Sequence, residues 1–189
     1  MLEAEHDHIA RAKQGDREAF GGLYDHYASP IYRFVAMKVT VREEAEDILH
    51  EVFLSAWQNM PSYESRGLPF SSWLYRIARN RVIDHYRTKK TLLSLDNEET
   101  GLSETLIAGT ISSGELIDIK FNLERVRQAL RKLSPDQQDV LILRFIEELT
   151  PAEIAKVLGK REGAIRIIQH RAVQNLKKIL AESPRYESR

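Results

Sequence analysis

Basic and amide side chains recur at helical spacing along residues 70–90, FSSWLYRIARNRVIDHYRTKK. Arg76, Asn80, Asp84 and Arg87 follow one another at steps of three or four residues, so they share one face of a helix. Arginine side chains hold phosphate oxygens, and an amide can hydrogen-bond a base edge. The segment predicts either a helix that binds nucleic acid or a core helix whose charged face is solvated.

A loop directly before this helix adds a second candidate feature. Residues 59–69, NMPSYESRGLP, contain two prolines and a glycine and therefore break the helical pattern. The loop carries Tyr63 and Arg66, and an aromatic ring beside a guanidinium can capture an unstacked base. An ordinary connection between two helices would have the same composition.

Metal-dependent hydrolysis is a rival chemistry, with His6, His8, His26 and nearby carboxylates as its only candidates. No histidine pair stands at helical ligand spacing with a carboxylate behind it, and His6 and His8 lie in a polar terminus. The chain has no cysteine, which leaves neither a thiolate metal site nor a disulfide. We therefore expect no metal, no cofactor and no catalytic residue at these histidines.

The helices that must hold these residues show clear apolar periodicity. Phe70, Trp73, Leu74, Ile77 and Ala78 form the buried stripe of the cationic helix. Residues 9–39 predict two short amphipathic helices with a break near Ser29-Pro30.

Residues 42–58 predict another helix with one apolar and one acidic face. The acidic face carries Glu43, Glu44, Glu46, Asp47, His50 and Glu51. Such a face is either solvated or suited to a basic surface of a partner.

Charge is unevenly distributed along the 189 residues. Formal net charge is zero, from 28 basic and 28 acidic residues. Residues 91–119 hold six acids and no lysine or arginine, so the remainder carries 28 basic against 22 acidic residues, or about +6. We interpret 91–119 as a flexible acidic linker with at most a short helical turn, between domains at 1–90 and 120–189.

The second domain shows two helix starts and a helix-turn-helix pattern. Ser134-Pro135 and Thr150-Pro151 each place a cap before a proline, followed at the third helical position by Gln137 and Glu153, respectively. A short helix then ends at Gly159, and a longer one begins near Glu162. The pattern predicts a DNA-binding helix-turn-helix, and its alternative is a helical hairpin in an ordinary bundle.

Taken in order, these segments resemble the extracytoplasmic-function (ECF) branch of the bacterial sigma-70 factors. The matching residues are EAEDI at 44–48, EVF at 51–53, Phe70, WLYRIA at 73–78, Asn80, AEIA at 152–155, LG at 158–159, EG at 162–163 and HRA at 170–172. The resemblance implies an all-α fold of two small helical domains, called sigma domain two and sigma domain four. Such proteins bind core RNA polymerase and direct it to promoters, without covalent chemistry of their own.

For the first domain, the resemblance implies two surfaces. One docks on the clamp helices of the largest polymerase subunit through Glu44, Asp47, Ile48, His50, Glu51 and Phe53, where His50 replaces the usual glutamine. The other opens and reads the minus-ten element, with a flipped base received by the loop at 62–68, through Tyr63, Arg66, Trp73, Arg76, Arg79, Asn80 and Arg87.

For the second domain, the resemblance implies contact with the polymerase flap and with the minus-thirty-five duplex. The DNA-contacting residues are Arg161, Arg166, Ile167, His170 and Arg171. The chain departs from the family at Arg161, which replaces a usual serine or proline cap, and at 167–169, where Ile-Ile-Gln replaces Ser-Arg-Leu. Ile165, Ile168, Ala172 and Leu176 are expected to be buried, and Ile167 either contacts a thymine methyl or is idle.

We also expect a monomer when free, no membrane contact and a cytoplasmic location, since residues 1–16 are polar and no apolar run has membrane-spanning length. Many members of this family are held inactive by an anti-sigma factor. The main rival is a polymerase-independent helix-turn-helix regulator, which would bind duplex DNA alone, usually as a symmetric dimer.

Overall fold

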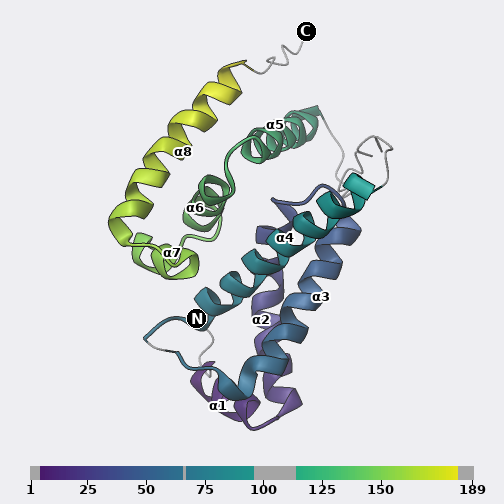
Figure 1. Ribbon diagram of the computed structural model, residues 1–189, viewed down its shortest axis with the longest axis vertical. Helices are drawn as coiled ribbons and strands as arrows, with labels where there is room; N and C mark the ends of the chain where they lie inside the picture. Colours follow the sequence, from purple (N-terminus) through teal and green to yellow (C-terminus); the bar gives the residue numbers. More distant parts are fainter. Residues whose placement is uncertain (1–4, 66, 96–113, 183–189) are drawn as a thin grey trace. The chain divides into compact units, whose positions relative to one another are not determined.

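The computed structural model describes residues 5–65, 67–95 and 114–182, with side chains at 5–65, 67–89 and 123–182. Its described residues form helices and their connections, without a strand. The chain divides into two compact units, residues 1–105 and 106–189 (Figure 1). The predicted all-α fold is thus confirmed.

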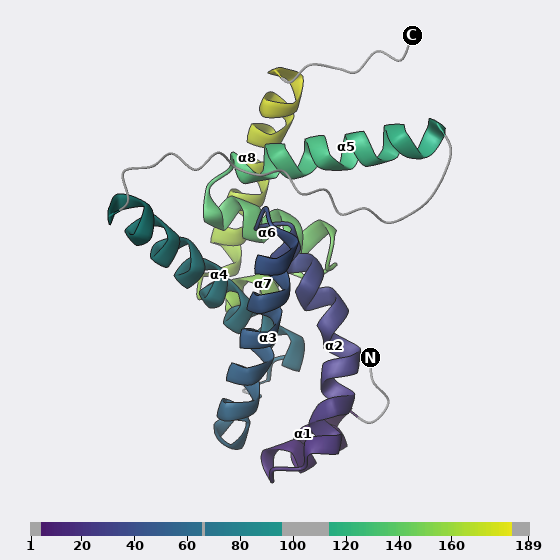
Figure 2. The ribbon, with the colours of Figure 1, turned by 90° about the vertical axis from the view of Figure 1, so that its right-hand side faces the viewer.

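Unit 1 is a bundle in which α2, α3 and α4 each contact the other two. Its elements are α1 (Glu5–Lys13), α2 (Arg17–Ala36), α3 (Arg42–Asn59), the 3-10 turn η1 (Met60–Ser62) and α4 (Phe70–Leu95). Figure 2 shows α2 and α3 running alongside each other. The largest fully buried side chains at their junction are Leu23, Ile31, Phe34, Met60, Phe70 and Leu74.

The turn between α1 and α2 is fixed by one carboxylate. Asp16 Oδ1 accepts from the backbone N–H groups of Glu18 and Ala19 at 2.9 and 3.1 Å, which caps α2. Asp16 Oδ2 accepts from Arg11 Nη2 at 2.7 Å. The N–H of Ala19, and then the Arg11 guanidinium, hold the pKa of Asp16 below its ordinary value. The first helix boundary therefore lies here, and not at Pro30.

The predicted break near Ser29-Pro30 is wrong, because Pro30 lies inside the continuous helix α2. A proline inside a helix removes one backbone hydrogen bond and costs about 3 kcal/mol. The helix continues because it buries Tyr27 before the proline and Ile31, Phe34 and Val35 after it. Burying several such side chains, at about 1.5–3 kcal/mol each, outweighs that cost.

Unit 2 contains α5 (Gly114–Arg131), α6 (Pro135–Phe145), α7 (Pro151–Leu158) and α8 (Glu162–Glu182). Helices α5, α6 and α7 all pack against α8, and Figure 2 shows α5 crossing it at a steep angle. The core is mainly apolar, although it also contains the buried Asp139 of α6, and its fully buried apolar members include Val140, Ile142, Leu143, Ile154, Ile165 and Ala172. The order of α7, a tight turn and α8 is that of a helix-turn-helix.

The two predicted helix starts in unit 2 differ in how they are made. Thr150 forms the predicted capping box with Glu153. The Ser134 side chain makes no such bond, and Gln137 accepts instead from Asn175 Nδ2 of α8 at 3.3 Å. Pro135 stands at the first helical position, where its fixed φ suits a helix and where it has no N–H to satisfy.

Helix extends into the predicted linker further than the expected short turn. Helix α4 continues to Leu95, and α5 begins at Gly114. Residues 91–95, TLLSL, contain no proline or glycine, and so nothing in them stops α4. The central part of the predicted linker, 96–113, lies outside the described residues.

Candidate nucleic-acid and partner interfaces

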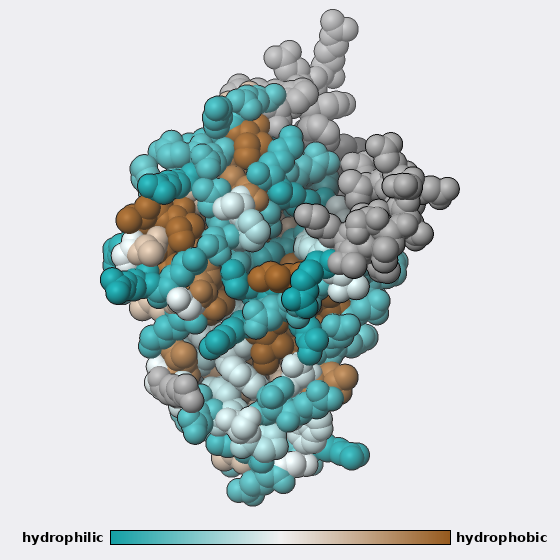
Figure 3. Space-filling view, in the orientation of Figure 1, coloured by the Kyte–Doolittle hydropathy of each residue, from teal (hydrophilic) through white to brown (hydrophobic). Residues whose placement is uncertain are grey.

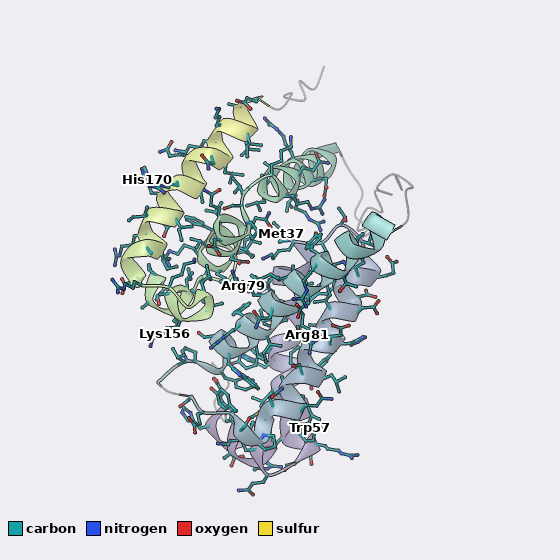
Figure 4. All side chains as sticks on the ribbon, viewed as in Figure 1. Met37, Trp57, Arg79, Arg81, Lys156 and His170 are labelled. Carbon is teal, nitrogen blue, oxygen red and sulfur yellow. The ribbon has the colours of Figure 1, made fainter. Side chains whose placement is uncertain are left out.

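The outward face of α4 presents the predicted cationic residues in one row. Arg76, Asn80 and Arg87 are exposed, whereas Leu74, Ala78 and Val82 on the opposite face are buried. Arg79 is half-buried, and Figure 4 shows Arg79 and Arg81 leaving α4 on different sides. The helix can therefore offer two guanidinium groups and one amide to the same ligand.

An apolar side chain, Ile83, interrupts this row, and sequence reasoning missed it. Ile83 is exposed and follows Asn80 by three residues and Arg79 by four. Its neighbour Tyr86 is also exposed, with its hydroxyl donating to the carbonyl of Lys38 at 2.6 Å. A count of helical positions from Asn80 would have found Ile83, because the residue three further on lies on the same face.

The ion pairs of α4 fall into two kinds. Arg87 pairs with Asp84 at 3.0 Å on the open surface, where such pairs contribute little to stability and exchange readily. Lys89 Nζ instead reaches across to Glu44 Oε1 of α3 at 2.8 Å, and His85 Nε2 lies 3.3 Å from Glu44 Oε2. Glu44 thus links α3 to α4, and its predicted contact with a partner stays a prediction.

Tyr63, a predicted minus-ten contact in the loop before α4, is buried in an aromatic cluster. Its ring centroid lies 5.2 Å from that of Phe70 and 4.7 Å from that of Trp73, and only 5% of the residue is exposed. Burial, and then the charge of Glu5, raise the pKa of the Tyr63 hydroxyl. Trp73 is half-buried at the edge of the same cluster, so its ring is more accessible than that of Tyr63. Arg66 lies outside the described residues.

The six residues of α3 that were predicted to bind a partner differ in their exposure and contacts. Asp47, His50 and Glu51 are exposed, as predicted for an interface. Ile48 and Phe53 are buried at 3% and 4% exposure and belong to the core. Glu44 is the residue paired with α4.

An exposed leucine, Leu54, lies on the same face of α3. It is 57% exposed and stands three or four residues from Glu51, His50 and Gln58, all of them exposed. Sequence reasoning passed over it because the buried stripe of α3 accounted for its other apolar residues. We call the surface of Asp47, His50, Glu51, Leu54 and Gln58 the α3 face. It combines acidic groups with one apolar anchor.

Helix α8 presents its predicted DNA-contacting residues outward. Arg166, Ile167, His170 and Arg171 are exposed, and Arg161 is exposed just before the helix begins. Figure 4 shows His170 on the outer side of α8. Arg166 is held by Glu162 at 2.6 Å, one turn earlier on the same surface. Of the four residues expected to be buried, Ile165 and Ala172 are fully so, whereas Ile168 and Leu176 are half-buried.

The turn before α8 is set by backbone geometry. Gly159 ends α7 in the left-handed region, at φ 65°, as the sequence predicted for a C-cap. The turn between α6 and α7 contains a second left-handed residue, Glu148, at φ 58°. A side chain in this region is strained, because Cβ approaches the following carbonyl.

Two other kinds of feature, a metal site and a membrane-spanning helix, are not found among the described residues. Within 5–65, 67–95 and 114–182, no three histidine or acidic side chains gather as a metal ligand set. None of the helices in that part of the chain is long and apolar enough to cross a membrane.

Two family models match the two units. The model described as Sigma-70 region 2 matches residues 23–91, and the one described as Sigma-70, region 4 matches residues 129–178. The first match contains α3 and the cationic row of α4, and the second contains the helix-turn-helix. The fold and surfaces thus define a class of transcription initiation factors, the sigma-70 family.

Comparison with individual relatives narrows the assignment from the sigma-70 family to one of its branches. The chain is 32% identical over 180 residues to the ECF RNA polymerase sigma factor SigW of Bacillus subtilis, covering 92% of this chain and 95% of SigW. It is 35% identical over 184 residues to the ECF RNA polymerase sigma factor BldN of Streptomyces coelicolor, covering 94% of this chain and 66% of BldN. The chain belongs to the ECF branch of the sigma-70 family.

Two solved structures share the fold of this chain. CnrH, solved in complex with the cytosolic domain of CnrY, aligns with a TM-score of 0.73 at 24% identity, over 96% of this chain and all of CnrH. The sigma factor RpoE of Bartonella quintana, solved with the anti-sigma factor NepR, aligns with a TM-score of 0.70 at 22% identity, over 87% of this chain and 98% of RpoE.

Proposed function

We propose that the chain binds core RNA polymerase through the α3 face and reads promoter DNA through the exposed faces of α4 and α8. The observation that carries the proposal is the separation of charge in unit 1. Acidic groups gather on the outer face of α3, and basic groups gather on the outer face of α4. One small bundle can therefore hold a basic protein surface and a nucleic-acid backbone at the same time.

The α3 face suits a basic helical partner, for which the clamp helices of the largest polymerase subunit are our candidate. Asp47 and Glu51 supply the charge that steers the encounter, and Leu54 supplies apolar area that a partner can bury. His50 stands between them where the family usually has glutamine. Of the residues first predicted for this contact, Ile48 and Phe53 would act by supporting α3 from inside.

On α4, we assign Arg76 and Arg87 to backbone phosphates of the minus-ten element and Asn80 to a base edge. Arg79 and Arg66 remain further candidates for the backbone. Flipping a base out of the stack costs a few kcal/mol, and stacking it on an aromatic ring returns about 1–3 kcal/mol. Trp73, with Tyr63 behind it, offers such a ring at the start of α4. Opening would therefore need the polymerase to hold the separated strands.

Unit 2 would read the minus-thirty-five element as a duplex, with α8 in the major groove. Arg166 and Arg171 can contact guanine edges or phosphates, and His170 and Arg161 extend the same surface. A good bidentate arginine contact discriminates by about 1–3 kcal/mol. Two or three such contacts are enough to select a class of promoters. The polymerase flap is the second protein contact that we propose for this unit.

The domain limits 1–90 and 120–189, with the acidic segment 91–119 between them, complete the proposal. The six acids of that segment would follow a basic channel of the polymerase and would weaken DNA binding by the free protein. Neutralising all six should therefore strengthen polymerase-free DNA binding. No change in that binding would contradict this role.

Control by an anti-sigma factor is part of the proposal. RpoE of Bartonella quintana, which shares this fold, was solved with such a factor. An inhibitor that covers the α3 face or α8 would compete with the polymerase or the promoter. The chain would work where the polymerase and chromosome are, in the cytoplasm, and as a monomer when free.

The α3 face is tested by charge reversal. We expect Asp47→Lys with Glu51→Lys to abolish co-purification with core RNA polymerase, because two acidic groups would become basic against a basic partner surface. The matched control is Glu18→Lys, an exposed acid on α2 outside the α3 face. Circular dichroism should show the same helix content in both variants. Normal polymerase binding by the double variant would refute this assignment.

A further inference from the structure

The recognition helix α8 carries one large apolar side chain that the fold does not use. Ile167 is 55% exposed, whereas Ile165 and Ala172, which face the core, are fully buried. Among the exposed residues of α8, those at 163, 166, 167, 170, 171 and 174 stand at the spacing of one helix face. Ile167 thus lies in the middle of the face that carries the candidate DNA contacts.

The surroundings of Ile167 limit what can cover it. Its neighbours on this face are the guanidinium of Arg166, which Glu162 holds at 2.6 Å, and the exposed side chains of His170 and Arg171. Figure 3 shows hydrophobic surface where α7 and the first turns of α8 lie. A cationic rim around an apolar centre fits an anionic ligand that offers one apolar group at its centre.

In the major groove of B-DNA, the apolar group at a base edge is the C5-methyl of thymine. Cytosine, adenine and guanine present donors and acceptors there but no methyl group. An isoleucine facing those groups would remove water from them without replacing its hydrogen bonds. The chemistry of Ile167 therefore favours one kind of base at one position.

We propose that Ile167 makes the chain specific for a thymine in the minus-thirty-five element, next to the base pair that Arg166 contacts, by packing against its C5-methyl group. The inference rests on the proposed function, since it needs α8 to lie in the major groove. It settles the choice between a methyl contact and an idle side chain in favour of the contact. Ile167 is one of the departures from the family pattern, which usually has a serine at this position.

The test removes the methyl group and nothing else. A promoter is first selected from a library with the full chain and core RNA polymerase. Each thymine of its minus-thirty-five element is then replaced singly by deoxyuridine, and run-off transcription is measured at limiting protein. We expect one replacement to lower transcription about fourfold, the equivalent of one buried methyl-sized group.

Variants of Ile167 show whether this residue reads the methyl group. Ile167→Ser should transcribe the thymine and deoxyuridine templates equally, whereas Ile167→Val should still prefer thymine. Gln174→Ala, on the same exposed face, is the matched control and should keep the full preference. A thermal melt of each variant checks that α8 is intact, and a surface substitution should leave it so.

The outcomes separate this inference from the proposed function. Equal transcription from a scrambled minus-thirty-five element would refute promoter reading by α8 altogether. Dependence on that element with no deoxyuridine-sensitive position would refute the methyl contact alone. A methyl preference that survives Ile167→Ser would show that another residue reads the thymine, and would also overturn the inference.

Discussion

Two adjacent residues of α3, Phe53 and Leu54, should respond to truncation in opposite ways. Phe53 is 4% exposed and packs edge-on against Tyr24, with ring centroids 4.6 Å apart. Leu54 is 57% exposed on the α3 face. From the sequence, Phe53 was predicted to contact the polymerase, and Leu54 was not. The structure places Phe53 in the core and Leu54 on the exposed α3 face, where we propose that a partner binds.

The magnitudes follow from burial. Replacing a core phenylalanine by alanine costs about 3–5 kcal/mol of unfolding free energy. Fully burying a leucine is worth about 1.5–3 kcal/mol, so burying its exposed part on docking is worth about 1 kcal/mol. Leu54→Ala should therefore weaken binding to core RNA polymerase roughly fivefold. It should leave the free energy of unfolding nearly unchanged.

Two measurements on each variant check this reasoning. Denaturant unfolding gives the stability, and titration of labelled protein with core RNA polymerase gives the Kd. Phe53→Leu is the control that keeps most of the buried volume and should lose far less stability than Phe53→Ala. An unchanged Kd for Leu54→Ala would show that Leu54 lies outside the interface. A large loss of stability for Leu54→Ala would refute its assignment to the surface.

Three further predictions concern other parts of the chain. Glu148→Gly should raise the unfolding free energy of unit 2 by about 0.5–1 kcal/mol, because glycine adopts the φ of 58° without strain; a lower melting temperature would contradict this. Asp16→Asn should destabilise the protein at pH 7, and the gap should close below about pH 4, because the folded-state pKa of Asp16 is depressed; a gap independent of pH would refute the cap and ion pair. Arg76→Ala should reduce the salt dependence of promoter binding by about one phosphate contact, and an unchanged slope would remove Arg76 from the backbone contacts.

The direction of the pH dependence expected for Asp16→Asn follows from the depressed pKa of Asp16. A carboxylate with a depressed pKa in the folded state contributes stability above its unfolded value, about 3.9 for aspartate. That contribution is lost as the pH falls through the folded pKa, when Asp16 becomes protonated and releases Arg11. The side-chain amide of the Asp16→Asn variant still accepts from the helix N–H groups but carries no charge. The pH-dependent part of the difference therefore isolates the charge of Asp16 from its role as a cap.

The helices were predictable because apolar spacing within one segment reports which of its faces is buried. The stripe of α3 and the caps at Thr150 and Gly159 follow from local rules and were confirmed. The predicted break at Pro30 was wrong because local rules do not include the packing of α2 against the other helices of the bundle. Burial of Ile31, Phe34 and Val35 depends on α3 and α4, which are distant in sequence.

The candidate surfaces were less predictable for the same reason. Glu44 belongs to an acidic helix face by its spacing, yet its partners His85 and Lys89 are more than 40 residues away in sequence. Tyr63 lies in a loop by composition, yet Phe70 and Trp73 enclose its ring. Leu54 and Ile83 could have been found from the sequence, since each lies at helical spacing from polar residues already chosen. Leu54 and Ile83 were missed because apolar residues of a helix were assigned to the core by default.

Transcription from a promoter library tests the central claim most directly. Purified core RNA polymerase alone, this protein alone, and the two together are each incubated with the library, and bound DNA and run-off transcripts are sequenced. We predict specific transcripts only from the mixture, with two conserved elements upstream of each start site. Tight, specific duplex binding by the protein alone, without association with polymerase, would contradict the account and would indicate a conventional helix-turn-helix regulator.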